Sequence, residues 1–244
     1  MNELSAHWQL ALAWLRDFPA LWLVATAAVF LLADKAYRLS RHFPLCNPLL
    51  LSVAGLAVLL TLLHVPYADY FHGALPLHWV LGPATVALAV PLYLNLHHVR
   101  ASLAPLSIAL AVGGLTGIVS ALLLGQLFGL SPASLISFAP KSVTTPIAMA
   151  ISEHLGGLPA LTANVVIITG IFGAVIVVPL MRLLGVRDLM VQGFALGVAA
   201  HGLGTARAVQ LSETAGAFSG LAMGLNAVLT SLALPLILAV WPLH

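Results

Sequence analysis

Long apolar runs are the feature that most constrains what this chain can fold into. Six of them are about as long as the roughly 20 residues that a helix needs to cross a membrane, and they cover 18–33, 48–64, 78–96, 104–128, 159–183 and 215–240. The runs are continuous and do not alternate with polar residues, which favours helices over the strands of a barrel. The sequence therefore predicts an all-α integral membrane protein with about six full transmembrane helices.

The composition excludes several other classes of protein. Hydrophobic residues make up 61% of the chain and charged residues only 7%, against about 25% charged residues in an ordinary soluble domain. So little polar surface excludes a soluble globular domain and a disordered chain. The nine Lys and Arg residues form no basic cluster, so we expect no nucleic-acid partner. The single cysteine, Cys46, excludes an internal disulfide, and no motif indicates catalysis, a metal or a cofactor.

Two further apolar segments, 134–154 and 189–213, are interrupted by residues that are unusual inside a membrane. The interruptions are Lys141 and Pro146 in the first segment, and His201, Gly202, Gly204 and Arg207 in the second. Charged side chains inside such segments rarely face lipid and usually mark a functional cavity. The two segments are therefore the first place to look for a site.

The distribution of basic residues predicts the orientation in the membrane. Loop 34–47 carries Lys35, Arg38 and Arg41, which places it in the cytoplasm, and loop 97–103 follows on the same side. If 134–154 spans the membrane, Arg182 and Arg187 lie outside, against the positive-inside rule. If it is re-entrant, they lie inside. We favour the re-entrant arrangement, and a broken but spanning helix is the alternative.

The two interrupted segments also resemble each other. The pattern T-x-x-A-x-x-x-S-E-x-x-G-x-x-x-x-L begins at Thr145 and again 60 residues later at Thr205. Its glutamates, Glu153 and Glu213, carry weight because the chain has only seven acidic residues. With the re-entrant arrangement, units of about 134–183 and 194–240 form an inverted repeat, which places a transporter's site at the midplane. Chance similarity of two apolar helices is the alternative.

Each interrupted segment is predicted to contain the start of a half-helix. Thr145 is typical of an N-cap and Pro146 of a first helical position. The aligned Thr205 follows Gly202-Leu203-Gly204, which predicts a second start at Ala206. Helix N-termini present unpaired N–H groups and partial positive charge, so two of them in one cavity favour an anion.

The candidate residues of this anion site are those at or beside the two starts. They are Lys141, Thr144, Thr145, His201, Gly204, Thr205 and Arg207. Other arrangements stay open: Lys141 at the membrane surface, Arg207 paired with Glu213, and threonines that bond within the helices. His201 is the best candidate for a proton-linked group, or it caps backbone carbonyls.

A second set of residues is assigned to the cavity or to coupling: Thr85, Tyr93, Glu153, Asn164, Glu213 and Asn226. Pro83 and Pro91 interrupt one predicted span and leave Thr85 and Tyr93 near freed backbone. Glu153 and Glu213 follow the threonines by eight residues, about 12 Å, near the predicted helix C-termini. We expect them to meet water or to pair with a cation such as Arg207 or a histidine, and a role as gate or proton acceptor is the alternative. The two asparagines are expected to hydrogen-bond across helices.

Three stretches together resemble the LrgB/CidB family of membrane proteins: Leu-Gly-Pro-Ala-Thr-Val-Ala-Leu-Ala-Val-Pro-Leu-Tyr at 81–93, Pro-Lys-Ser-Val-Thr-Thr-Pro-Ile-Ala-Met-Ala-Ile-Ser at 140–152, and Ala-Leu-Gly-Val-Ala-Ala-His-Gly-Leu-Gly-Thr-Ala-Arg-Ala at 195–208. The resemblance covers about residues 46–240. It implies a transport domain over residues 46–244. Residues 1–45 match only as a generic first span, which we expect to follow a short interfacial helix at 4–15.

The resemblance implies a bacterial inner-membrane protein, a small LrgA/CidA-like membrane partner, and self-association with a dimer favoured. The family was first described as holin- or antiholin-like, with effects on murein hydrolases and lysis. A plastid relative exports glycolate and imports glycerate, and some bacterial relatives are linked to pyruvate uptake. The predicted function is therefore secondary transport of small monocarboxylates. The alternative is a holin-like regulator of lysis without specific transport.

Overall fold

The computed structural model describes residues 20–40, 46–87, 89–94 and 96–241, which contain helices and no strand. The helices are α2 (Ala20–Leu39), α3 (Pro48–Leu62), α4 (Tyr67–Ala87), α5 (Ala89–Leu94), α6 (Leu96–Ala101), α7 (Leu103–Leu127), α8 (Pro132–Phe138), α9 (Thr145–His154), α10 (Pro159–Leu183), α11 (Leu189–Leu211) and α12 (Glu213–Val240). Among them α2, α7, α10, α11 and α12 are long and apolar enough to cross a membrane. The prediction of an all-α membrane protein is confirmed. The predicted interfacial helix at 4–15 lies outside the described residues.

The chain divides into two compact units, Met1–Val86 and Ala87–His244. In the first unit, Trp22 of α2 packs edge-on against Tyr70, with 5.9 Å between the ring centroids. Helix α2 continues to Leu39, six residues beyond the predicted span, and an Arg38–Asp34 ion pair of 2.8 Å lies on this extension. Such i,i+4 pairs support helix formation where hydropathy falls. The domain boundary predicted after residue 45 stays a prediction.

The region between residues 65 and 103 differs from the sequence-based expectation. Residues 65–77, expected as a loop between the predicted spans 48–64 and 78–96, largely form the first half of α4, which begins directly after Pro66 and continues through Pro76 and Pro83. The predicted span 78–96 is shared between α4 and α5, and most of the predicted loop 97–103 belongs to α6. Hydropathy measures preference for lipid, whereas helix formation needs only backbone hydrogen bonds. Polar stretches were therefore mistaken for loops.

The first interrupted segment turns back on itself. Helices α8 and α9 have 7 and 10 residues, about 10 and 15 Å of helix, which is too short to cross a hydrocarbon core of about 30 Å. The backbone N–H of Leu158, after α9, donates to Ser137 Oγ in α8 at 2.7 Å. The chain therefore turns back to α8 after α9, as the re-entrant arrangement requires. Residues 132–154 are called the first hairpin below.

The second interrupted segment, α11, is also folded back. Its helical backbone is broken at Ala200 and at His201, where φ is 43° and ψ is −135°. A Cβ added at Gly204 would overlap the carbonyl oxygen of Leu196, although eight residues span about 12 Å in a straight helix. The arms 189–200 and 201–211 therefore lie against each other. Residues 189–211 are called the second hairpin, and they do not form one straight span despite their length.

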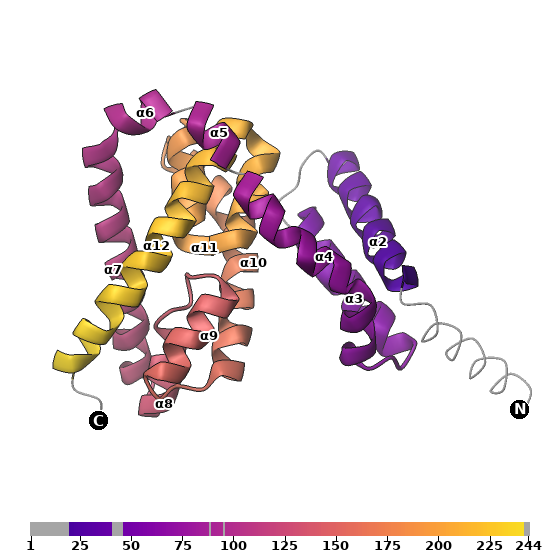
Figure 1. Ribbon diagram of the computed structural model, residues 1–244, viewed down its shortest axis with the longest axis horizontal. Coiled ribbons are helices and arrows are strands. Elements are labelled where there is room, and N and C mark those ends of the chain that lie inside the picture. The colour runs from indigo at the N-terminus through magenta and orange to yellow at the C-terminus, as the bar shows by residue number, and fades with distance from the viewer. Residues whose placement is uncertain (1–19, 41–45, 88, 95, 242–244) are drawn as a thin grey trace, which may run out of the picture. The chain divides into compact units, whose positions relative to one another are not determined.

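The two hairpins lie at opposite ends of the second unit (Figure 1). Helix α7 leads to the first hairpin, α10 runs from the first hairpin to the second, and α12 returns (Figure 1). Ala148 of α9 packs in one cluster with Val166 of α10, and Thr205 of the second hairpin bonds Ser219 Oγ of α12 at 3.0 Å. Each hairpin thus packs against the long helix that follows it. An inverted repeat requires that the two hairpins enter from opposite ends, as they do here. That the two repeat units superpose stays a prediction.

The two glutamates of the repeated pattern occupy different local structures. Glu153 lies near the end of α9, whereas Glu213 is the first residue of α12. The expectation that both lie near helix C-termini is therefore wrong for Glu213. Ser212 is extended and its hydroxyl accepts from Ala215 N–H, so α12 starts directly after the second hairpin. A carboxylate in the first turn of a helix is favourably placed for the helix dipole.

We expect Gly204→Ala to destabilise the protein, because the added methyl group would overlap the Leu196 carbonyl. Overpacking of this kind costs about 1–3 kcal/mol. Thermal unfolding of the detergent-solubilised protein measures the effect. Gly224→Ala is the matched control, since nothing lies within 4 Å of a Cβ at that position. Equal unfolding temperatures for the two variants would contradict the close contact between the arms of the second hairpin.

Candidate functional site

The starts of the two half-helices meet beside the same part of α10. Ala148, in the first turns of α9, packs in one cluster with Val166. The ring nitrogen Nε2 of His201, where the second arm of the second hairpin begins, lies 3.0 Å from the carbonyl oxygen of the same Val166. The tips of both hairpins are therefore brought together inside the unit, although they enter from opposite ends.

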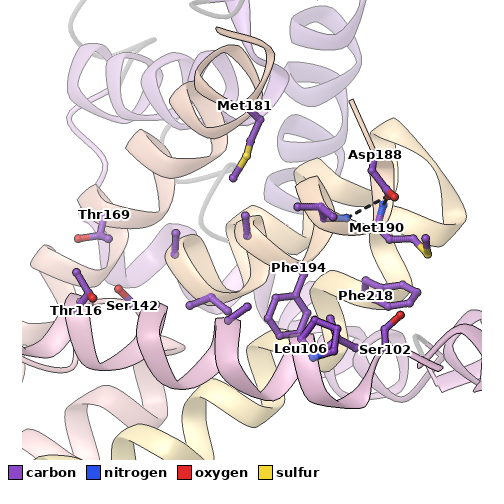
Figure 2. Close-up of a pocket in the computed structure, with 18 of the residues that line it drawn as sticks. Ser102, Leu106, Thr116, Ser142, Thr169, Met181, Asp188, Met190, Phe194 and Phe218 are labelled. Atoms are coloured by element: carbon purple, nitrogen blue, oxygen red, sulfur yellow. Dashed lines mark hydrogen bonds between the residues drawn. The ribbon is translucent and has the colours of Figure 1, made fainter. Parts of the chain in front are cut away.

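A cavity of about 810 Å³ lies next to the hairpin tips. Its inner end is lined by Lys141 and by four hydroxyl side chains, Thr116, Ser120, Ser142 and Thr169. Its apolar walls include Leu106, Phe194, Val198 and Phe218, and its other end carries Ser102, Asp188 and Met190. Figure 2 shows Thr116, Ser142 and Thr169 gathered at one end, with Asp188 and Met190 away from them at the other. The cavity thus has a polar inner end and an apolar passage.

Lys141 lies in the turn between α8 and α9, at the tip of the first hairpin. Its ammonium donates to the carbonyl oxygen of Gly117 at 2.5 Å, and Gly117 lies near the middle of α7. Lys141 also lines a second cavity of about 390 Å³, which it shares with Thr169 and Ala199. A cation this far from the helix ends is costly without counter-charge or hydrogen bonds. The alternative that placed Lys141 at the membrane surface is therefore not what the structure shows.

The first predicted half-helix start is confirmed to within one residue. Helix α9 begins at Thr145 with Pro146 as its second residue, and Thr144 is the N-cap. Both threonines are half-buried. The Thr-Pro signal was informative because proline gives up no hydrogen bond in the first turn of a helix.

The second predicted start is displaced. The break lies at Ala200 and His201, and not before Ala206. Thr205 is within the second arm, where its hydroxyl donates to the His201 carbonyl at 3.0 Å and meets Ser219 Oγ. His201, Gly204 and Thr205 are buried in helix contacts and are not among the residues that line either cavity. Gly204 permits the close approach of the two arms and is not itself the break.

Arg207 is not brought to Lys141. It follows His201 by six residues, about 9 Å along the arm, and its guanidinium donates to Gln210 Oε1 at 3.0 Å. It does not line either cavity. The expectation of two cations in one cavity fails because the second half-helix begins earlier than its glycines suggested.

The remaining candidates are scattered. The side chains of Glu153, Asn164, Glu213 and Tyr93 are exposed. Thr85 belongs to α4, and its side chain lies outside what the structure describes. Asn226 is only 1% exposed, and its Nδ2 donates to the carbonyls of Val198 at 3.1 Å and Ser142 at 3.4 Å. Of this set, only Asn226 is brought to the hairpin tips among the side chains that the structure describes.

Sequence reasoning missed the hydroxyl groups of the cavity. On α7, Gly113, Thr116, Gly117 and Ser120 all line it. Their i, i+3, i+4, i+7 spacing puts small and polar residues on one helix face. That stripe could have indicated the cavity wall, although hydropathy alone marks the segment only as an apolar span.

Comparisons with known proteins identify the family of the chain. Residues 26–240 match the model of the LrgB-like family. The chain is 39% identical to the uncharacterized protein YwbG of Bacillus subtilis, over 89% of this chain and 96% of that one. It is 28% identical to the holin-like protein CidB of Staphylococcus epidermidis, over 90% and 96%. No solved structure matches the chain significantly. A helical fold with two interrupted segments and a family match across most of its length together show that the chain belongs to the LrgB-like family.

Proposed function

We propose that this protein is a secondary transporter for small monocarboxylates. The observation that carries the proposal is Lys141, which lies at the hydroxyl-lined end of the cavity. A carboxylate there would accept hydrogen bonds from the ammonium and from hydroxyls such as those of Thr116 and Ser142. Charge-assisted hydrogen bonds are the strongest that such a site can offer. The volume of about 810 Å³ falls in the usual range for small-molecule sites, about 300–1,000 Å³.

The cavity is proposed to be reached from the cytoplasm. Its outer end carries Asp188, between the turn that holds Arg187 and the first residue of α11. Arg182, in the last turn of α10, lies close by in the chain. The positive-inside rule places such arginines in the cytoplasm. On the side of the unit away from this outer end, an apolar cluster fills the space between α7, the end of α8 and α12. It is formed by Ile118, Leu122, Leu135, Ala139 and Leu234.

The orientation gives a prediction of its own. In a Cys46→Ala background, a cysteine at position 187 should react with an impermeant thiol reagent from the cytoplasmic face only, because lysines and arginines resist translocation. Labelling of oriented membrane vesicles from each side measures this. A cysteine at position 129, in the uncharged turn after α7, should react from the opposite face. Labelling of position 187 from outside would overturn the orientation.

A holin-like role is the second candidate, because several relatives are named holin-like protein CidB. In that case the protein acts on lysis by assembling with copies of itself or with a small LrgA/CidA-like membrane partner. Such an assembly does not require a cation at the inner end of a hydroxyl-lined cavity. Self-association as a dimer and the bacterial inner membrane as the location belong to this proposal under both candidates.

Purified protein in liposomes distinguishes the two candidates. We expect saturable uptake of labelled short hydroxy- and keto-acids, competed by unlabelled acid, with no release of trapped sucrose. A transporter shows saturation because each substrate must occupy one site. A pore would release sucrose and show no saturation with the acid, which would favour the holin-like role.

A further inference from the structure

Asn226 joins the two hairpins at their tips. It lies near the middle of α12, and its amide nitrogen donates to the carbonyl of Val198 at 3.1 Å and to that of Ser142 at 3.4 Å. Val198 belongs to the second hairpin and Ser142 to the tip of the first, and both residues line the large cavity. One buried side chain thus connects the two tips directly behind the cavity wall.

Neither carbonyl has the donor that a helix interior would provide, where a carbonyl accepts from the N–H four residues later. Ser142 lies in the turn before α9, outside any helix, and Pro146, four residues on, has no N–H. For Val198 the residue four positions on is Gly202, which lies beyond the break at Ala200 and His201. A buried carbonyl without a partner is costly, and the two N–H bonds of a single amide group serve both.

The position of the Asn226 amide is fixed by its surroundings. Its Oδ1 is buried without a hydrogen-bond partner, and a Cβ placed on Gly114 of α7 would lie 2.8 Å from it. An unsatisfied buried acceptor is unfavourable, so packing for its own sake does not account for asparagine here. The two donated hydrogen bonds account for it, and glycine at position 114 leaves room for the oxygen.

The two tips are not held equally. The second hairpin is in close backbone contact with α12, where a Cβ on Gly193 or Gly197 would meet the carbonyls of Ala215 and Ser219. The first hairpin consists of two short helices, and its hydrogen bond to Asn226 is the longer of the two. The tip of the first hairpin is also tied to α7 by the Lys141–Gly117 hydrogen bond. Its longer bond, to Asn226, is therefore the contact that can part.

We propose that Asn226 is a positioning residue that latches the tip of the first hairpin to the second hairpin and α12. Release of the Ser142 carbonyl lets the first hairpin move and opens the cavity to the face opposite its present mouth. The hydrogen bonds of the latch do not depend on any substrate. The inference that their release exposes the cavity to the other face during transport rests on the proposed function.

Cysteine accessibility tests the latch without any substrate. In a Cys46→Ala background, S142C should react with an impermeant thiol reagent from the cytoplasmic face, because residue 142 lines the cavity. The substitution leaves the backbone carbonyl in place, so the hydrogen bond to Asn226 is retained. Adding Asn226→Leu, which keeps the branched shape and the number of heavy atoms but has no donor, should raise the rate of labelling from the opposite face about five- to tenfold. That is the effect of losing about one net hydrogen bond. Gly114→Ala should act in the same direction by displacing the amide, and it serves if Asn226→Leu does not insert.

A208C, on the second hairpin, is the matched control, because Ala208 is fully buried and does not line either cavity. It should stay unlabelled from both faces. Unchanged labelling of S142C in both variants would overturn the latch. Labelling of A208C from either face in the Asn226→Leu background would also overturn it, because that indicates general loosening. If the labelling shifts as expected while no acid is taken up, the latch stands and the proposed transport function fails.

Discussion

Replacing Lys141 by glutamine is expected to reduce uptake of a small monocarboxylate about 10- to 150-fold. A hydrogen bond to a charged group contributes about 1.5–3 kcal/mol, which corresponds to that range in affinity. Glutamine keeps a donor, so the contact with the Gly117 carbonyl can be retained while the charge is lost. Initial rates of uptake into proteoliposomes over a range of acid concentrations measure the effect. We expect it in the apparent KM as well as in the maximal rate.

Arg207→Gln is the matched control, since it removes one positive charge at a position that does not line either cavity. Transport by this variant should be close to that of the unmodified protein. The opposite result, with Arg207→Gln inactive and Lys141→Gln normal, would restore the site expected from the repeated threonines. Normal transport by both variants would contradict a substrate site that depends on either positive charge.

Three of the long apolar helices could be predicted from the sequence almost to the residue. The predicted spans 104–128, 159–183 and 215–240 correspond to α7, α10 and α12, with ends that differ by no more than two residues. These helices begin and end where apolar runs begin and end, because backbone polar groups must be satisfied within the helix in a membrane. In these three helices the ends of the apolar run and of the helix coincide. In the more polar region of α4 they do not.

Local chemistry explains which of the two breaks could be found. The start of α9 is encoded by Thr144, Thr145 and Pro146, whose conformational preferences are strong. The break in α11 is at His201, which has a positive φ, a conformation rare for any residue other than glycine. The neighbouring glycines attracted the prediction because they are the usual residues for such a backbone. The break falls at His201 because of the way the two arms pack against each other and against α12. No short sequence pattern indicates that packing.

The cavity itself depends on tertiary structure. Thr116 and Ser120 could be counted as ordinary internal hydrogen-bonders of an apolar helix, and only their position opposite Lys141 gives them a role. Asn226 was expected to bond across helices, and the structure shows which carbonyls it bonds. That pairing joins positions 84 and 28 residues apart, so no local reading of the chain could have supplied it.

Ala199→Trp is expected to abolish transport while leaving the protein in the membrane. Ala199 lines both cavities and shares them with Lys141 and Thr169, so an indole there would occupy the space that a carboxylate must enter. We expect uptake to fall at least about tenfold, which corresponds to a loss of only 1.4 kcal/mol of binding.

Ala206→Trp provides the comparison for this variant, because Ala206 lies in the other arm of the same hairpin and its side chain is exposed. Its uptake should be near normal. Uptake assays together with thermal unfolding of both variants separate a blocked cavity from a misfolded hairpin. If Ala199→Trp transports normally with an unchanged unfolding temperature, the substrate does not pass Lys141. If both variants lose uptake and unfold at lower temperature, tryptophan disrupts the hairpin and the cavity is not the cause. A holin-like activity that does not use the cavity would survive Ala199→Trp, so retained lysis with lost uptake would assign the two activities to different parts of the molecule.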